Sequence, residues 1–202
     1  MTSVIHLARH GETVWHAENR YAGSSDVGLT ERGMAQARDL GAWAAAHGPL
    51  TVHSSDLGRA VVTATPAAEA LGVRLQVRPA LREVDFGRGE GLTRAEMAER
   101  FPDDLARFLE RPAESPLPDG ESGRAAVERA LPELRALASQ SEEPALVVMH
   151  STLLRLVLCT LVGIDPNRYR SVMPKVRNVA VTTLELSADG RSAALLGFNV
   201  PV

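Results

Sequence analysis

Two histidines follow apolar runs that have the composition of buried strands. Residues 4–8 lead into Arg9 and His10, and residues 145–149 lead into His150. A short apolar run rich in β-branched residues that ends at a glycine or a polar residue is typical of a strand. Because ligands bind at the carboxyl ends of the strands in open α/β sheets, we expect the two histidines to meet at one edge of a sheet.

Together with two arginines, these histidines predict chemistry on phosphate. A phosphate ester carries about two negative charges, and guanidinium groups bind its oxygens bidentately while staying protonated. Arg9 and Arg59 are the candidates for this role. A neutral imidazole can attack phosphorus and form a phosphohistidine, which divides hydrolysis into two easier steps. We therefore assign His10 as the nucleophile, and a protonated His150 as the group that stabilises charge on the transferring phosphoryl oxygens.

An acid is expected within residues 81–91, which concentrate acidic side chains and have no clear helical or strand period. The alkoxide that leaves in ester hydrolysis needs a proton, so a carboxyl group near the mouth should act first as an acid and then as a base. Glu83 is our choice, with Glu90 and Asp85 as the alternatives. We interpret the remaining strand and helix histidines as structural: His6, His47 and His53.

Apolar periodicity places these residues on alternating strands and helices. We expect strands over residues 4–8, 50–53, 73–77, 145–149, 179–186 and 193–200. We expect helices over residues 33–46, 57–71, 93–101, 103–110, 122–139 and 151–162, with Thr30 capping the first and residues 54–56 capping the second. This alternation indicates an α/β fold, a three-layer α/β/α sandwich whose mostly parallel, doubly wound sheet gains one antiparallel edge strand from the final hairpin.

A single domain over residues 1–202 is expected, because a chain of this length has enough apolar residues for one full core. The two short helices and the proline-rich connector after them form a helical insertion at about residues 92–121, over the mouth of the site. Residues 15–28 form a glycine-bearing loop that we expect to line the pocket beside His10.

Composition excludes several classes of partner. The formal net charge is −3 and the isoelectric point is about 6.1, so nothing draws the chain to nucleic acid or to an anionic membrane surface. No stretch approaches the roughly 20 apolar residues of a spanning helix, and no basic and apolar leader opens the sequence. Cys159 lies in an apolar run without a disulfide partner, which suits a reducing cytoplasm. We expect a cytoplasmic protein; whether it forms a homodimer is left open.

Five sequence blocks occur in a fixed order along nearly the whole chain. They are Arg9-His10-Gly11-Glu12-Thr13 with Gly23, Asp26, Leu29-Thr30 and Gly33; Ser54-Ser55-Asp56-Leu57 with Arg59-Ala60; Leu81-Arg82-Glu83-Val84-Asp85-Phe86-Gly87 with Glu90-Gly91; Gly120-Glu121-Ser122; and His150. With these blocks the chain resembles the histidine phosphatase superfamily, in its phosphoglycerate mutase-like branch. The resemblance implies a phosphoglycerate mutase-like fold, with His10 as the phosphorylated nucleophile and Glu83 as the proton donor. It also implies that three residues complete the phosphate pocket: Arg9, Arg59 and His150.

Three positions depart from the family's pattern. His16 stands where the family usually has an asparagine that helps to bind phosphate, and its charge would depend on pH near neutrality. A His16→Asn substitution would then flatten the pH dependence of substrate binding between roughly pH 5.5 and 7.5. Ser151 and Thr152 replace two glycines, and Arg88-Gly89 replaces a pair that usually ends in an aromatic residue. We count four further residues as phosphate-binding or substrate-binding candidates: Thr13, His16, Gly23 and Ser151.

The leading interpretation is a metal-independent phosphatase, without a cofactor, that hydrolyses phosphate monoesters of small metabolites. The first alternative is a phosphoglycerate mutase that uses the same phosphohistidine. By the same resemblance, the family's mutases are expected to have longer chains with extra segments around the mouth of the site. This sequence ends directly after its last predicted strand. The second alternative is a non-catalytic phosphate-ligand sensor or interaction module, which a missing nucleophile, arginine or acid would indicate; all three are present. These motifs do not specify the substrate.

Overall fold

The computed structural model describes residues 2–48, 50–140, 143–187, 189–190 and 192–202. Six strands form one sheet in the order β3-β2-β4-β1-β5-β6. The first four strands of this order are parallel, whereas β5 pairs antiparallel with both β1 and β6, which confirms a mostly parallel sheet with an antiparallel side. The strands comprise Thr2–Arg9 (β1), Thr51–Ser54 (β2), Gln76–Val77 (β3), Ala145–Met149 (β4), Val181–Ser187 (β5) and Ala193–Val200 (β6).

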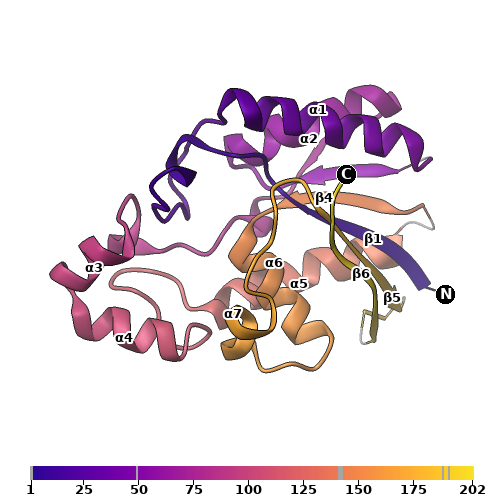
Figure 1. The fold of residues 1–202 in the computed structure, drawn as a ribbon. Helices are drawn as coiled ribbons and strands as arrows, with labels where there is room; N and C mark the ends of the chain where they lie inside the picture. Colours follow the sequence, from indigo (N-terminus) through magenta and orange to yellow (C-terminus); the bar gives the residue numbers. More distant parts are fainter. Residues whose placement is uncertain (1, 49, 141–142, 188, 191) are drawn as a thin grey trace.

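Helices cover both faces of the sheet, with α1 and α2 on one face and α5 and α6 on the other (Figure 1). This arrangement is the three-layer α/β/α sandwich that the sequence predicts. The helices comprise Glu31–Ala46 (α1), Gly58–Leu71 (α2), Arg94–Arg100 (α3), Pro102–Glu110 (α4), Gly123–Gln140 (α5), Ser151–Leu161 (α6) and Tyr169–Val172 (α7).

Side chains of the central strands alternate between two apolar cores. Leu7 of β1 and Val147 of β4 belong to the core that includes residues of α5 and α6, whereas Ala8 and Val148 belong to the core with α1 and α2. Successive strand residues point to opposite faces of a sheet, and helices bury both faces here. Every residue of β4 is therefore buried. The two innermost strands, β1 and β4, are also the ones that lead into the candidate histidines.

Helix ends agree with the sequence at α1 but not at α2. Thr30 caps α1, because its hydroxyl accepts the Gly33 N–H at 3.0 Å. The prediction that residues 54–56 cap the next helix is wrong, since Leu57 is the N-cap of α2 and makes no side-chain capping bond. Ser54 and Ser55 are fully buried under the carboxyl edge of the sheet instead. Their hydroxyls therefore belong to the interior of the site region and not to a helix start.

The third predicted strand is shorter than expected. Only Gln76–Val77 forms β3, so the prediction of a strand from residue 73 is wrong. This strand is at the edge of the sheet and pairs only with β2, and that four-residue neighbour offers few backbone partners. The sequence also gave no signal for α7, because a single helical turn is too short to show an apolar period.

The predicted helices of the 92–121 segment are present as α3 and α4, which project past the sheet on the side opposite the N-terminus (Figure 1). A capping box between Thr93 and Glu96 begins α3. Met97 and Phe108 are buried in the same apolar core as Ile5 of β1, so the segment packs on the core of the sheet. Across the ranges given above, no helix has the length and apolar character needed to cross a membrane.

Candidate active site

His10 lies one residue beyond β1 at the carboxyl edge of the sheet. Its backbone N–H donates to the Met149 carbonyl at 3.0 Å, which extends the pairing of β1 with β4. The ring Nδ1 lies 2.7 Å from the Gly11 carbonyl, and because a carbonyl only accepts, Nδ1 carries the proton and Nε2 keeps its lone pair. Burial, with the charges of Arg9 and Arg59, lowers the pKa of His10 well below its ordinary value. The imidazole is therefore neutral and has a nucleophilic Nε2.

The turn after His10 is held by the close approach of two glycines. A Cβ on Gly33 would lie 2.1 Å from the Glu12 carbonyl oxygen, and one on Gly11 would lie 2.6 Å from the Gly33 carbonyl oxygen. Side chains at these positions would push the turn away from the first turn of α1. The Gly11 N–H also donates to Thr63 Oγ1 of α2 at 2.9 Å. Both helices on this face thus fix the backbone beside the candidate nucleophile.

His150 is fully buried directly after β4, and its ring centroid lies 5.3 Å from that of His10. Ser55 Oγ lies 2.7 Å from His150 Nε2 and accepts the Leu57 N–H at 3.4 Å. The Ser55 hydroxyl has a hydrogen-bond acceptor when it donates to Nε2. A neutral imidazole that accepts at Nε2 carries its proton on Nδ1. We infer that Ser55 selects the Nδ1–H tautomer of His150.

The surroundings of His150 favour a neutral imidazole, whereas the sequence-based assignment has this residue protonated during phosphoryl transfer. Burial is the largest cause that lowers the pKa of His150 well below its ordinary value, followed by the charges of Arg59 and His10. A neutral imidazole with its proton on Nδ1 still offers a hydrogen-bond donor beside the nucleophile.

Arg59 is 1% exposed at the start of α2. Its guanidinium donates to the carbonyl oxygens of Ala22 at 3.2 Å, Gly23 at 2.6 Å and Ser25 at 2.7 Å. Arg59 therefore stabilises the conformation of the predicted pocket loop, residues 15–28. Burial lowers the pKa of Arg59, and its charge in turn contributes to the depressed pKa values of both site histidines.

Three of the predicted phosphate ligands hold a buried nitrogen that has no hydrogen-bond partner among the described residues. These atoms are Arg9 Nε, Arg59 Nε and His150 Nδ1. Buried polar groups in folded proteins are normally hydrogen-bonded, and leaving one unpaired costs about 1–3 kcal/mol. All three residues lie near the candidate nucleophile, since the charges of Arg9 and Arg59 act on the pKa of His10 and the ring centroid of His150 is 5.3 Å from that of His10. Donors of this kind can stabilise an oxyanion.

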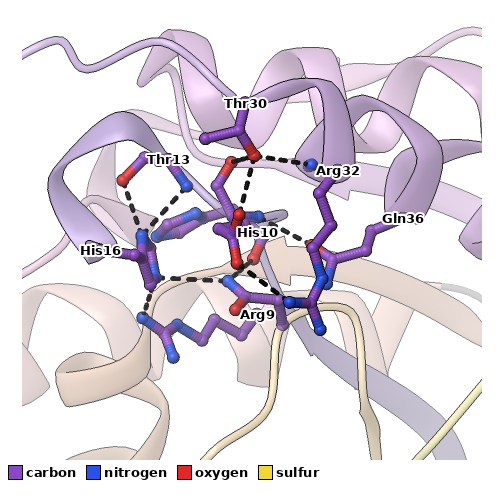
Figure 2. A network of polar contacts seen from close by, with 10 residues as sticks. Arg9, His10, Thr13, His16, Thr30, Arg32 and Gln36 are labelled. Carbon is purple, nitrogen blue, oxygen red and sulfur yellow. Dashed lines mark hydrogen bonds and ion pairs between the residues drawn. The ribbon is translucent and has the colours of Figure 1, made fainter.

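Arg9 is oriented by a short chain of side chains (Figure 2). Its guanidinium donates to the Val176 carbonyl at 2.8 Å and to His16 Nε2 at 2.5 Å. Because arginine only donates, Nε2 accepts this bond, and on the other side of the ring Nδ1 lies 3.0 Å from the Thr13 backbone nitrogen and 2.7 Å from Thr13 Oγ1. Burial lowers the pKa of Arg9 to about 10, so the guanidinium stays charged at neutral pH.

His16 does not titrate near neutrality, contrary to the prediction from the sequence. Burial and the neighbouring charge of Arg9 lower the pKa of His16 to about 4. A neutral imidazole can accept the Arg9 hydrogen bond, whereas a protonated one would repel the guanidinium. In this structure His16 therefore positions Arg9 and carries no charge of its own.

The carboxylate of Glu83 lies at the N-terminus of α6, the helix that follows His150. Glu83 Oε2 accepts the Thr152 N–H at 2.9 Å, and Oε1 accepts the Leu153 N–H at 2.8 Å. The first turn of a helix has unpaired N–H groups and the positive end of the helix dipole, which together attract a carboxylate. This contact brings the predicted acid to the histidines although they are far apart in sequence.

A cavity of about 690 Å³ opens over these groups. The predicted site residues that line it are Arg9, His10, Thr13, His16, Glu83 and Ser151. Three other predicted residues are buried and do not line the cavity: Gly23, Arg59 and His150. The structure thus brings the predicted residues into one region, with some exposed to the cavity and others behind them.

Glu83 is the one of the three candidate acids that lines the cavity. Glu90 instead accepts the backbone N–H groups of Ser24 and Ser25, each at 2.7 Å. Burial alone would raise the pKa of Glu90, but the hydrogen bonds from these serines lower it below its ordinary value. Asp85 accepts the Gly87 N–H at 2.8 Å. Within the described part of the chain, no three His, Cys, Asp or Glu side chains form a cluster that could hold a metal ion.

Arg20 and Tyr21 of the predicted pocket loop line the cavity, as do Thr93 and Arg94. Sequence reasoning missed other residues of the cavity wall, and the main ones are Arg155, Tyr169 and Arg170. Arg155 is four positions after Ser151, so helical spacing alone places the two on one face of α6 and offered a usable signal. Arg170 lies on α7, which no sequence pattern indicated. Thr93 and Arg94 come from the 92–121 segment, which therefore contributes to the wall.

The chain belongs to the histidine phosphatase superfamily (branch 1), whose family profile matches residues 5–199. It is 30% identical over 166 residues to phosphoserine phosphatase 1 of Hydrogenobacter thermophilus, with 82% of this chain and 79% of that protein covered. It is 33% identical over 185 residues to a probable phosphoglycerate mutase, GpmB, of Salmonella arizonae, with 90% and 84% covered. The structure of a mycobacterial glucosyl-3-phosphoglycerate phosphatase superposes with a TM-score of 0.86 at 27% identity and covers 99% of this chain and 100% of that one.

Proposed function

We propose that this protein is a phosphatase that hydrolyses phosphate monoesters of small metabolites through a phosphohistidine on His10. The observation that carries the proposal is the set of three unpartnered buried donors beside an imidazole whose Nε2 lone pair is free. Such donors stabilise the charge on a transferring phosphoryl group, and the lone pair attacks it. Two similar proteins, the phosphoserine phosphatase and the glucosyl-3-phosphoglycerate phosphatase, are named for hydrolysis of phosphate monoesters.

In the first step of the proposed reaction, the lone pair of His10 Nε2 forms a bond to phosphorus while the bond from phosphorus to the ester oxygen breaks. The leaving alkoxide takes a proton from the carboxyl group of Glu83. The N–H donors of Arg9, Arg59 and His150 receive the phosphoryl oxygens. In the second step, water attacks phosphorus and gives a proton to the Glu83 carboxylate, and the N–P bond breaks with its electron pair returning to Nε2.

The experiment that tests the proposal combines turnover with trapping of the intermediate. Purified protein is assayed for phosphate release from p-nitrophenyl phosphate, and an acid-sensitive phosphoryl group is sought on His10 after rapid denaturation at alkaline pH. His10→Ala should lower kcat by at least about a thousandfold, because the nucleophile is lost. Retained turnover in this variant would refute the mechanism.

His47 provides the matched control for that experiment. It is an exposed histidine after α1 and its ring stacks on Trp43 with 4.1 Å between ring centroids, away from the cavity lining. His47→Ala removes the same side chain and should keep both turnover and the phosphohistidine. A Glu83→Gln variant should still form the phosphohistidine with a good leaving group such as p-nitrophenolate, yet release phosphate slowly, because the second step needs the base.

A phosphoglycerate mutase remains the second candidate, and its support is the 33% identity to the probable mutase of Salmonella arizonae. The same phosphohistidine would serve if it returned its phosphoryl group to a second hydroxyl of the substrate before water reached it. The two activities are distinguished by incubating the protein with 3-phosphoglycerate. Formation of 2-phosphoglycerate faster than inorganic phosphate would favour the mutase, and the reverse order would favour the phosphatase.

A further inference from the structure

The cavity wall is strongly cationic beyond the phosphate pocket. Its single carboxylate is that of Glu83, against five guanidinium groups: Arg9, Arg20, Arg94, Arg155 and Arg170. Arg20 forms ion pairs with Glu18 and Glu96. No carboxylate among the described residues forms an ion pair with Arg94, Arg155 or Arg170. This part of the wall thus has an excess of positive charge.

Two of these arginines stack on the same tyrosine ring. The guanidinium carbons of Arg155 and Arg170 lie 4.5 Å and 4.7 Å from the ring centroid of Tyr169. Stacking on the ring stabilises each cation, but it also brings two like charges together in a partly desolvated wall, which is unfavourable without an anion. Burial is the largest cause that lowers the pKa of Arg155; Tyr169 and Glu83 act to raise it, and the charge of Arg170 adds to the lowering.

The hydrogen bonds of these arginines fix their direction and leave donors unused. Arg155 donates from Nε to the Ser151 carbonyl at 2.9 Å and from Nη1 to the Met173 carbonyl at 3.1 Å. No hydrogen bond within the described residues engages Arg155 Nη2. Arg170 makes one long hydrogen bond, from Nη1 to the Phe108 carbonyl at 3.4 Å, and also stacks on the Phe108 ring. Carbonyl groups and aromatic rings thus position both guanidinium groups, and each keeps N–H groups that no hydrogen bond among the described residues uses.

We propose that Arg155 and Arg170 form a subsite for a second anionic group of the substrate, a carboxylate or a second phosphate. The subsite rests on the proposed phosphatase function, because its occupant is the far end of the ester whose phosphate meets His10. The Arg155 guanidinium lies close to the phosphate pocket, because its Nε donates at 2.9 Å to the carbonyl of Ser151, the residue directly after His150. The two anionic groups of the substrate are therefore joined by a short skeleton of a few carbon atoms. Planar guanidinium groups bind either oxyanion through paired N–H donors.

Equilibrium binding tests the subsite without requiring turnover. Calorimetry on the His10→Ala protein compares two matched ligand pairs, 3-phosphoglycerate with glycerol 3-phosphate, and fructose 1,6-bisphosphate with fructose 6-phosphate. Each pair differs in the second anion, which is a carboxylate in the first pair and a phosphate in the second. In at least one pair, the ligand with two anionic groups should bind about 10- to 100-fold more tightly than its partner with one, because hydrogen bonds to charged groups are strong. Arg170→Gln in the same background should reduce that preference by about tenfold.

Arg168 supplies the matched control, because it is an exposed arginine two positions before Arg170 and does not line the cavity. Arg168→Gln should leave the preference in each pair unchanged.

Equal affinities within both pairs would overturn the proposal, as would a preference that Arg170→Gln leaves intact. If Arg170→Gln lowers the melting temperature, Arg155→Lys serves as the second variant, since it keeps the charge but loses the paired donors; an unchanged preference there would also count against the subsite. Turnover of the wild-type protein is measured separately, so failure of the phosphatase proposal is seen as absent phosphate release with the binding preference intact.

Discussion

Replacing Ser55 with alanine should slow catalysis through a residue that does not touch the substrate. The hydroxyl lies 2.7 Å from His150 Nε2, and its donated proton keeps the imidazole proton on Nδ1. Without it, Nε2 has no hydrogen-bond partner in either tautomer, so the preference for the Nδ1–H form, worth about 1–3 kcal/mol, is lost and the Nε2–H form becomes populated. In that form the phosphoryl oxygens lose the Nδ1–H donor. The same energy converts to a fall in kcat of about 5- to 150-fold.

Two measurements separate this effect from general damage to the fold. Steady-state kinetics with p-nitrophenyl phosphate should show the loss mainly in kcat, and ¹⁵N NMR of the imidazole should show the proton of His150 moving from Nδ1 to Nε2. Ser54→Ala is the matched control, because Ser54 is equally buried and its hydroxyl has no hydrogen-bond partner among the described residues. That control should leave both the tautomer and kcat unchanged.

The tautomer argument is wrong if Ser55→Ala and Ser54→Ala agree in kcat to within about twofold. It is equally wrong if kcat falls while the NMR signals keep the proton on Nδ1, since Ser55 would then act by another route. Urea unfolding of both variants checks that any change in kcat occurs in a folded protein.

Three further predictions concern His16, the pocket loop and metal ions. His16→Asn should leave the pH dependence of substrate binding unchanged between roughly pH 5.5 and 7.5, because the imidazole is already neutral there; a flattened profile would contradict the depressed pKa. The unfolded chain protonates this histidine near pH 6.5 and the folded protein only near pH 4, so stability falls on acidification through that window, and melting temperatures of His16→Asn should fall less than those of the wild type. Gly23→Ala should abolish activity and lower the melting temperature, because a Cβ there would lie 2.4 Å from the Val84 carbonyl oxygen and 2.9 Å from the Phe86 backbone nitrogen, whereas a Cβ at Gly28 meets nothing within 4 Å, so Gly28→Ala should be neutral. Treatment with EDTA should leave phosphate release unchanged, because the proposed steps use only side chains; a loss restored by a divalent ion would refute that part.

The positions of the two histidines could be predicted from the sequence because they depend on strand periodicity alone. An apolar run that ends in a polar residue marks a strand end, and His10 and His150 follow two strands that lie side by side. Glu83 could be predicted as a candidate acid because acidic residues are concentrated in one short segment. Its actual partners, the N–H groups of α6, are a tertiary contact that no local pattern encodes.

Protonation states were the part of the site that the sequence could not supply. His16 and His150 were both expected to carry a charge at or near neutral pH, and both have depressed pKa values. The cause in each case is burial together with guanidinium groups brought in by folding. Ser55 illustrates the same limit, since a serine ahead of a helix reads as a cap, whereas its hydroxyl in fact bonds to His150 from a distant part of the chain.

The innermost position of β1 and β4 has a consequence for how such proteins diverge. The two histidines follow strands that helices bury on both faces, so their spacing is protected from changes at the surface. The far wall of the cavity comes largely from loops and from the short helices α3 and α7, and loops tolerate substitutions and insertions better than the central strands do. Natural selection can therefore exchange one substrate for another by altering this wall while inheriting the chemistry unchanged. The phosphoserine phosphatase and the glucosyl-3-phosphoglycerate phosphatase that this chain is similar to differ in the substrates for which they are named, as such an architecture permits.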